Sequence, residues 1–334
     1  MDITAQTLPF LDVMMLVFGA LLAGIYVLVK AGNFAIDGSV SLARHLNISP
    51  LVIGFTIIAF GTSLPELIVS VNANLKGFPG LAIGNVVGSN ISNILLVCGM
   101  SIFLIPFHLH LEKSEKMDVL MLFASTALLV VFLSFELISL THGIVMVSLL
   151  ILYVSWQYHQ AARNKTPKEN DTAETDIAYE TIKLSLVMTI FGLVGIALGA
   201  ELMVRSAVIG ARLFGVPESV IGMTIVAVGT SLPELVTCLI AAKRMQFGIV
   251  VGNIVGSGVF NILSIIGVTA IVSPIMLGNV SEKLVTTDAY VMMMITALFC
   301  LGLLCMTRLS RLIGFIMLVG YIIFTFEQYY SFMI

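Results

Sequence analysis

The chain has 334 residues, of which 59% are hydrophobic and 10% are charged, and its mean hydropathy is +1.09. Soluble domains are about a quarter charged, so this composition argues against a soluble enzyme and indicates a polytopic membrane protein. The net charge of −3 provides no basic field for a nucleic acid, which excludes nucleic-acid binding.

The segment before residue 10 carries an acid, Asp2, and no Lys or Arg. The apolar run that follows lacks a small-residue cleavage site, so we interpret it as a membrane span rather than a signal peptide. Apolar runs of about 20 residues each predict ten spans in total. They lie at residues 10–30, 50–75, 81–106, 117–136, 141–160, 181–204, 219–242, 247–273, 287–306 and 310–330.

A long polar stretch at residues 163–180 separates five predicted spans from five. Its composition predicts a linker between a first unit, residues 1–162, and a second unit, residues 181–334. With loops alternating between the two sides of the membrane, twelve Lys and Arg residues fall on the linker side and four on the other. The positive-inside rule then predicts a cytoplasmic linker and places both termini outside.

The cysteines and histidines form no convincing metal motif. His108 and His110 have a spacing that suits a soft metal, but their place near a span end favours interfacial solvation. The cysteines lack CxxC spacing, and we interpret them as small packing residues. They are Cys98, Cys238, Cys300 and Cys305.

The sequence Gly-Thr-Ser-Leu-Pro-Glu at residues 61–66 places a carboxylate and a proline inside the second predicted span. An ionisable side chain is costly in hydrocarbon, so an intramembrane Glu indicates a functional site. On a helix, Thr62 and Ser63 share a face with Glu66. Pro65 has no N–H and crowds the preceding turn, so we expect backbone oxygens of that turn, from Ala59 onward, to lose their helical partners.

The same hexapeptide returns at residues 229–234, which is 168 positions later. At this offset, residues 54–69 match residues 222–237 at 11 of 16 positions, and residues 83–97 match residues 251–265 at 8 of 15. Each half contains an odd number of spans, so the second copy must enter the bilayer from the opposite face. We therefore predict an all-α membrane protein with ten transmembrane helices, built as two inverted five-helix repeats with broken helices 2 and 7.

The third span adds a second polar cluster, in which Ser89 and Asn93 lie one turn apart on one face; Ser257 and Asn261 repeat the pair. Glycines four residues apart accompany both pairs, and this spacing is typical of closely packed membrane helices, although a role in shaping the site is equally open. These glycines are Gly84, Gly88, Gly252 and Gly256.

The two copies together predict a cation site of carboxylate, hydroxyl and amide oxygens, with no imidazole or thiolate. Such hard ligands suit Ca²⁺ or Na⁺ rather than Zn²⁺ or copper. Two carboxylates balance either one divalent ion or several monovalent ions, so the set suggests exchange. Its members are Thr62, Ser63, Glu66, Ser89, Asn93, Thr230, Ser231, Glu234, Ser257 and Asn261.

On these duplicated motifs, Gly-Thr-Ser-Leu-Pro-Glu and Gly-Ser-x-x-x-Asn, the whole chain resembles the calcium/cation antiporter superfamily, close to its prokaryotic sodium/calcium exchangers. The resemblance implies a cytoplasmic-membrane protein that needs no cofactor, is not an enzyme, and works by alternating access, with a monomer sufficient. The first and sixth spans, near residues 10–45 and 181–212, would slide past the rest.

The resemblance also implies roles for the candidate residues. Glu66 and Glu234 would coordinate Ca²⁺, and the Asn93 and Asn261 side chains would line the centre. Sodium sites would use hydroxyls and carbonyls around them, from Thr62, Ser63, Ser89, Thr230, Ser231, Ser257, Ala59 and Ala227.

Two departures from the family pattern affect this interpretation. Gly258 stands where the first copy has Asn90, which removes no expected ligand. Asn261 stands where some prokaryotic relatives carry Asp and where potassium-dependent members carry an acid, so a potassium requirement is not expected. The Gly-Asn-Ala-x-Glu motif of the proton-coupled branch is absent from the sequence, which favours sodium as the coupling ion.

Other functions remain open at this stage. Ca²⁺/H⁺ exchange through titration of Glu66 and Glu234 is the nearest alternative, because burial raises the pKa of a carboxylate. An intramembrane aspartyl protease would need Tyr-Asp and Gly-x-Gly-Asp motifs, which the sequence lacks. A channel is a further alternative, since broken helices also build pores.

Overall fold

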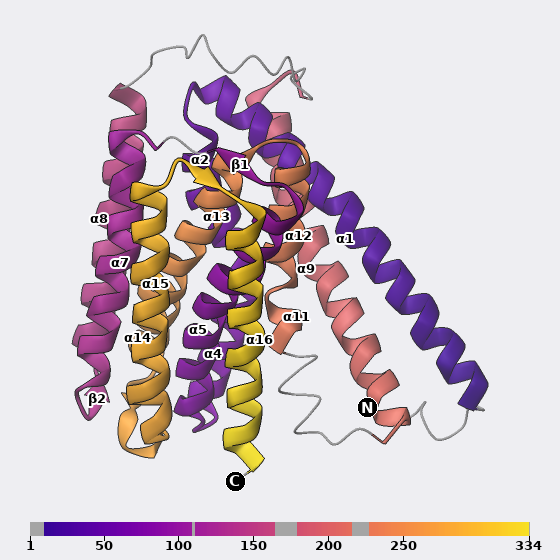
Figure 1. Ribbon diagram of the computed structural model, residues 1–334, viewed down its shortest axis with the longest axis vertical. Helices are drawn as coiled ribbons and strands as arrows, with labels where there is room; N and C mark the ends of the chain where they lie inside the picture. The colour runs from indigo at the N-terminus through magenta and orange to yellow at the C-terminus, as the bar shows by residue number, and fades with distance from the viewer. Residues whose placement is uncertain (1–9, 109–110, 164–178, 216–226, 334) are drawn as a thin grey trace.

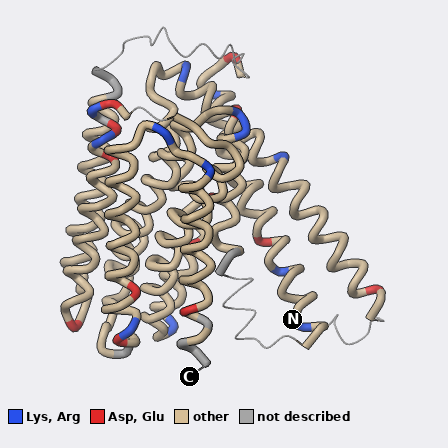
Figure 2. Tube along the Cα trace, in the orientation of Figure 1, with Lys and Arg blue, Asp and Glu red and all other residues tan. Residues whose placement is uncertain are grey.

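The computed structural model describes residues 10–108, 111–163, 179–215 and 227–333. These residues form a bundle of helices with four two-residue strands at the helix ends (Figure 1). Charged residues lie mostly toward the two ends of the bundle (Figure 2). This distribution fits a bilayer, whose hydrocarbon core disfavours charge.

The first half of the chain begins with a 37-residue helix and continues through a broken second span and a third span interrupted by a π-helical segment. Its elements are α1 (Phe10–Leu46), α2 (Pro50–Ile53), η1 (Gly54–Ile58), α3 (Ala59–Thr62), α4 (Leu64–Leu75), α5 (Pro79–Ser92), η2 (Asn93–Cys98), α6 (Gly99–Leu104), β1 (Phe107–His108), α7 (Lys113–Leu133), β2 (Leu137–Ile138) and α8 (Leu140–Arg163).

The described elements of the second half follow a similar order, with two additional short helices, η5 and η6, before α15. They are α9 (Ile182–Leu213), α11 (Ala227–Thr230), α12 (Leu232–Lys243), α13 (Phe247–Phe260), η4 (Asn261–Ile266), α14 (Gly267–Val272), β3 (Ile275–Met276), η5 (Leu277–Asn279), η6 (Leu284–Asp288), α15 (Ala289–Cys305), β4 (Arg308–Leu309) and α16 (Arg311–Met333).

Within the described residues, eight helices are long and apolar enough to span a membrane, and the bent unit from α2 to α4 makes a ninth. The remaining predicted span, residues 219–242, falls partly outside the described residues. The predicted linker also lies mostly outside them. The count of ten therefore stays a prediction, whereas the all-helical membrane architecture is confirmed.

The sequence repeat is also a repeat of the backbone. The bounds of α4, α5, η2 and α6 return as those of α12, α13, η4 and α14, each shifted by 168 residues. Left-handed residues that follow helix ends recur at the same offset: Asn47 (φ 52°) with Gly215 (φ 72°), and Gly77 (φ 82°) with Met245 (φ 59°). The same chain path is thus built twice, even where a glycine in one copy is replaced in the other.

The helices of the first and sixth spans extend beyond the apolar runs at residues 10–30 and 181–204, because α1 continues to Leu46 and α9 to Leu213. These ends are close to the ranges 10–45 and 181–212 that the family resemblance implies. The two helices run antiparallel, with Gly24 beside Gly199 and Gly38 beside Thr189. Small residues along both helices allow this close approach, which replaces lipid contact and supports the added length. Together the two helices diverge from the rest of the bundle, on the right in Figure 1.

Helices and strands of each half pack against those of the other half. Helix α8 of the first half packs against α14 of the second, with Gly143 against Gly267, and α16 packs against α6, with Gly314 against Gly99. The strands are exchanged too, because β1 pairs with β4 and β2 with β3, both antiparallel. These exchanges hold the broken spans and α13 in the centre of the molecule.

Candidate cation-binding site

Both copies of the hexapeptide form a helix break with the same geometry. Helix α3 ends at Thr62 and α4 begins at Leu64, with a bend of 43° between the two parts of the span. Ser63 at the break has φ −85° and ψ 0°, and Ser231 has φ −88° and ψ 2°. Each proline occupies the first turn of the following helix, where its missing N–H costs nothing. The break therefore follows from the local sequence in both repeats.

The Ala59 carbonyl corrects one sequence-based expectation. It accepts a hydrogen bond from the Ser63 N–H at 3.1 Å and another from the Thr62 hydroxyl at 3.3 Å. The prediction that this oxygen loses its helical partner is therefore wrong for Ala59 in this conformation, since the chain bends at Ser63 without opening the preceding turn. Its repeat partner Ala227 begins α11, but the surroundings of the Ala227 side chain lie outside the described residues.

The two carboxylates of the motif meet at the centre of the protein. Glu66 and Glu234 are each 1% exposed, and their charges interact with each other. Glu66 Oε2 and both carboxylate oxygens of Glu234 have no hydrogen-bond partner. A buried carboxylate without a partner lowers the stability of a protein by roughly several kcal/mol, unless a bound cation or a proton neutralises its charge. This pair therefore has the chemistry of a cation site.

The neighbouring amides and one hydroxyl add further unpartnered oxygens. Among the described residues, ten buried side-chain atoms lack a partner, and six of them belong to predicted site residues. They are Ser63 Oγ, Glu66 Oε2, Asn93 Oδ1, Glu234 Oε1, Glu234 Oε2 and Asn261 Oδ1. Asn93 and Asn261 each open a π-helical segment, a local distortion that often marks functional sites.

The hydroxyls of the predicted set have mixed surroundings. Ser257 donates to Asn253 Oδ1 at 3.5 Å, and Thr62 lies 3.4 Å from the same oxygen. Ser231 accepts a hydrogen bond from Ser92 at 3.0 Å, so it differs from its repeat partner Ser63. Ser89 is buried, whereas Thr230 is partly exposed.

Several buried polar residues near the site were not predicted. Asn253 links Thr62 and Ser257, and its own amide donates to Cys238 Sγ at 3.3 Å. Its repeat partner Asn85 donates to the Glu66 carbonyl at 3.2 Å and to Ser70 Oγ at 2.9 Å. Both asparagines occupy the Gly-Asn pair that opens the duplicated third-span motif, and this repetition was the signal that could have identified them.

Asn90 and Ser92 distinguish the first repeat from the second. The Asn261 amide donates to Asn90 Oδ1 at 3.4 Å, and Ser92 donates to Ser231. The second copy has Gly258 and Phe260 at the equivalent positions. Both contacts join the two repeats, and neither has a counterpart at the repeat-related positions, because Gly258 and Phe260 cannot make it. The site is therefore not fully symmetric.

The glycines spaced four residues apart have different surroundings in the two repeats. Side chains at Gly252 and Gly256 would run into the backbone of η1 and its neighbours, at Leu51 and Phe55. A Cβ on Gly88 would meet nothing within 4 Å, and one on Gly84 would make only an ordinary contact. The second pair therefore permits close helix packing, whereas the first pair leaves space beside the site.

No competing metal cluster is present within the described part of the chain. It holds no group of three or more His, Cys, Asp and Glu side chains suited to a metal ion. His110 lies outside the described residues, so the His108 and His110 pair is not tested. The four cysteines are free thiols, and Cys98, Cys238 and Cys300 are buried among packed helices.

The chain matches the family described as sodium/calcium exchanger protein over residues 16–159 and 184–330. A putative antiporter, CaxA of Alkalimonas amylolytica, is 36% identical over 308 residues, covering 90% of this chain and 95% of that protein. The sodium/calcium exchanger MaX1 of Methanosarcina acetivorans is 30% identical, with 94% and 98% covered. The solved structure of the sodium–calcium exchanger NCX_Mj soaked with Na⁺ superposes with a TM-score of 0.79 at 33% identity, covering 93% of this chain and 98% of that one.

Proposed function

This chain belongs to the sodium/calcium exchanger family, and from that premise we propose that it exchanges Ca²⁺ for Na⁺ across the membrane by alternating access. The observation that carries the proposal is the group of six unpartnered oxygen atoms around Glu66 and Glu234. All are hard ligands, and the two carboxylates match the charge of one Ca²⁺ or of several Na⁺ ions. MaX1 and NCX_Mj, whose names specify sodium and calcium, support this choice of ions.

We assign Ca²⁺ to the space between the two carboxylates. Glu66 and Glu234 would bind the ion directly, and Asn93 and Asn261 would contribute their unpartnered oxygens or line the centre. Sodium ions would use the surrounding hydroxyls, with the Ala59 and Ala227 carbonyls. The hydroxyl ligands are Thr62, Ser63, Ser89, Thr230, Ser231 and Ser257. Since the same carboxylates serve both ions, binding of one would displace the other.

Alternating access would involve α1 and α9. These two helices pack on each other along their length and diverge from the other helices, which suits movement as a pair. The linker at residues 163–180 would lie in the cytoplasm, between the units 1–162 and 181–334, with both termini outside. One chain contains both halves of the site, so a monomer would suffice in the cytoplasmic membrane of a prokaryote.

The experiment is uptake of radioactive Ca²⁺ into proteoliposomes driven by an outward sodium gradient. Glu66→Gln and Glu234→Gln should each reduce uptake at least about 100-fold, since losing a buried charge contact costs about 3 kcal/mol or more. Glu201→Gln is the matched control, because Glu201 lies on α9 with its side chain 56% exposed. Unaltered uptake in both site variants, with normally inserted protein, would contradict the site.

Exchange of Ca²⁺ for H⁺ is the second candidate, because two buried carboxylates without donors also suit protons. The two candidates separate when uptake is measured under a sodium gradient with the pH gradient clamped, and then under a pH gradient without sodium. Sodium-driven uptake at clamped pH supports the first candidate. Uptake that follows only the pH gradient supports the second.

A further inference from the structure

An apolar groove of about 700 Å³ lies between α15 and α16. It extends from Met306 and Leu309 at one end to Thr287 and Glu327 at the other. Thr287 and Met306 are 19 positions apart in the chain, which corresponds to about 28 Å of helix. This length is close to the roughly 30 Å thickness of the hydrocarbon core of a bilayer.

At the equivalent place in the first repeat, side-chain hydrogen bonds join the two helices. There, α7 and α8 are joined because Tyr153 and Gln157 donate to the same oxygen of Asp118, at 2.5 and 2.6 Å. In the second repeat, Gln328 makes the matching bond to Asp288 at 2.8 Å. The residue 171 positions after Tyr153 is Phe324, which lines the groove and has no hydroxyl to donate. Asp288 therefore has one fewer side-chain donor than Asp118.

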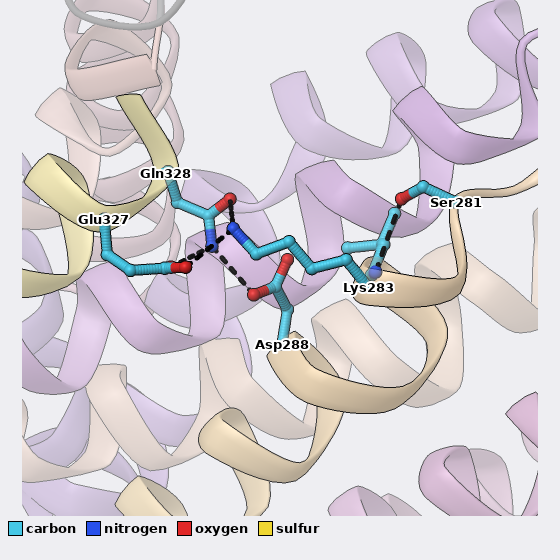
Figure 3. A network of polar contacts seen from close by, with 6 residues as sticks. Ser281, Lys283, Asp288, Glu327 and Gln328 are labelled. Carbon is cyan, nitrogen blue, oxygen red and sulfur yellow. Dashed lines mark hydrogen bonds and ion pairs between the residues drawn. The ribbon is translucent and has the colours of Figure 1, made fainter. Parts of the chain in front are cut away.

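The polar end of the groove carries an excess of negative charge. Lys283 lies 2.9 Å from a Glu327 carboxylate oxygen and 3.3 Å from Gln328 Oε1, while Gln328 also contacts Asp288 (Figure 3). Two carboxylates thus face one ammonium group. The side chain of Glu327 is 53% exposed, so it is available to a ligand from the bilayer.

We propose that this groove binds a phospholipid with a primary ammonium headgroup, such as phosphatidylethanolamine. An acyl chain would fill the apolar length, and the ammonium group would contact Glu327, while the buried Asp288 nearby would add its negative charge and the phosphate would lie near Lys283. An anionic glycerol headgroup would meet two carboxylates and be repelled. A choline headgroup has no N–H to donate to them.

The groove also extends to the helical segment that carries Asn93, one of the residues of the cation site. Ile94 and Leu95 line it, and they directly follow Asn93 in the π-helical segment η2. An acyl chain in the groove would therefore support the segment that carries one of the unpartnered amide oxygens. The lipid site stands independently of the exchange reaction, because it is defined by α15, α16 and their polar end.

The test uses the full-length protein in nanodiscs of equal parts phosphatidylethanolamine, phosphatidylcholine and phosphatidylglycerol, released and weighed by native mass spectrometry. We expect one retained lipid, enriched in phosphatidylethanolamine. Glu327→Gln should reduce that enrichment about two- to fivefold, the range of an exposed ion pair. Glu282→Gln is the control, because Glu282 is exposed nearby but does not line the groove.

A second pair of variants tests the apolar length. A Cβ on Gly302 would meet nothing within 4 Å, so Gly302→Trp should fill the groove and abolish retention. Gly19→Trp is the control, since Gly19 is equally open but lies on α1. Gly320→Leu, directed at Leu95, replaces Gly302→Trp if that variant does not fold. Equal retention of the three headgroups, or a lipid-free dimer in which a second copy covers the groove, would overturn the proposal. No ion or transport step enters this measurement.

Discussion

We expect the ion pair between Arg244 and Asp37 to hold α1, one of the two helices for which we propose movement, against the end of α12. Arg244 directly follows α12, and its guanidinium contacts the Asp37 carboxylate on α1 and, at 2.5 Å, the Asn33 side-chain oxygen. The positions 168 residues away are Lys76 and Arg205, both cationic. The repeat therefore has this attachment at one end only, the end that the positive-inside rule assigns to the cytoplasm.

The magnitude follows from the burial of the pair. The side chains of Arg244 and Asp37 are 33% and 30% exposed, so the pair lies between a surface and a buried ion pair. We estimate that Arg244→Ala destabilises the contact between α1 and the end of α12 by about 1–2 kcal/mol, relative to a conformation in which this contact is open. That difference corresponds to about a 5- to 30-fold increase in the open population.

Hydrogen–deuterium exchange of α12 and of the second half of α1, in nanodiscs, measures that population directly. The exchange rate should rise by the same factor in Arg244→Ala and return toward normal in the doubly exchanged variant Asp37→Arg with Arg244→Asp. Arg205→Ala is the control, because its ion pair with Glu201 is exposed and lies within one helix. An unchanged rate in Arg244→Ala, or an equal rise in Arg205→Ala, would refute the reasoning.

Two further predictions concern stability, and the first compares equivalent glycines of the two repeats. Gly256→Ala should destabilise the protein by about 1–3 kcal/mol, because the new Cβ would lie 2.7 Å from Ala59 Cβ. Gly88→Ala, at the repeat-related position, should leave the thermal unfolding temperature unchanged, and equal effects of the two would contradict this account. Tyr153→Phe should reduce the free energy of unfolding by about 1–3 kcal/mol and so lower the unfolding temperature, since buried Asp118 would lose the hydrogen bond that Tyr153 donates at 2.5 Å. An unaltered temperature would show that the bond contributes nothing.

The broken helices and their carboxylates were predictable because the chain repeats its own motif. The hexapeptide at 61–66 and its copy gave the proline position, the break and the buried Glu in each half. The continuous spans from α5 to α6 (Pro79–Leu104) and from α13 to α14 (Phe247–Val272) also agree with the predicted third and eighth spans to within two residues. Apolar runs and the helix-breaking hexapeptide determine the structure of the residues that contain them, so helix breaks and span ends can be predicted from short stretches of sequence.

The contacts between the repeats were not predictable in the same way. Asn261 with Asn90, and Ser231 with Ser92, join residues 171 and 139 positions apart, and nothing in either local motif specifies the partner. The turns of α1 beyond the apolar run at residues 10–30 pack against α9, so the apolar pattern alone did not indicate them and only the family resemblance implied their extent. The Asp118 cluster was missed because its donors lie on a different span.

The exchanged packing of the two halves has a consequence for synthesis. Gly143 packs against Gly267, so α8 emerges from the ribosome 124 residues before the surface that it needs. Likewise, β2 is made long before its partner β3. The first five spans must therefore wait in the bilayer as an incomplete unit, and assembly can finish only after α16, which packs against α6, has been inserted. A chain truncated within the linker would leave those surfaces facing lipid and would be a natural substrate for membrane quality control.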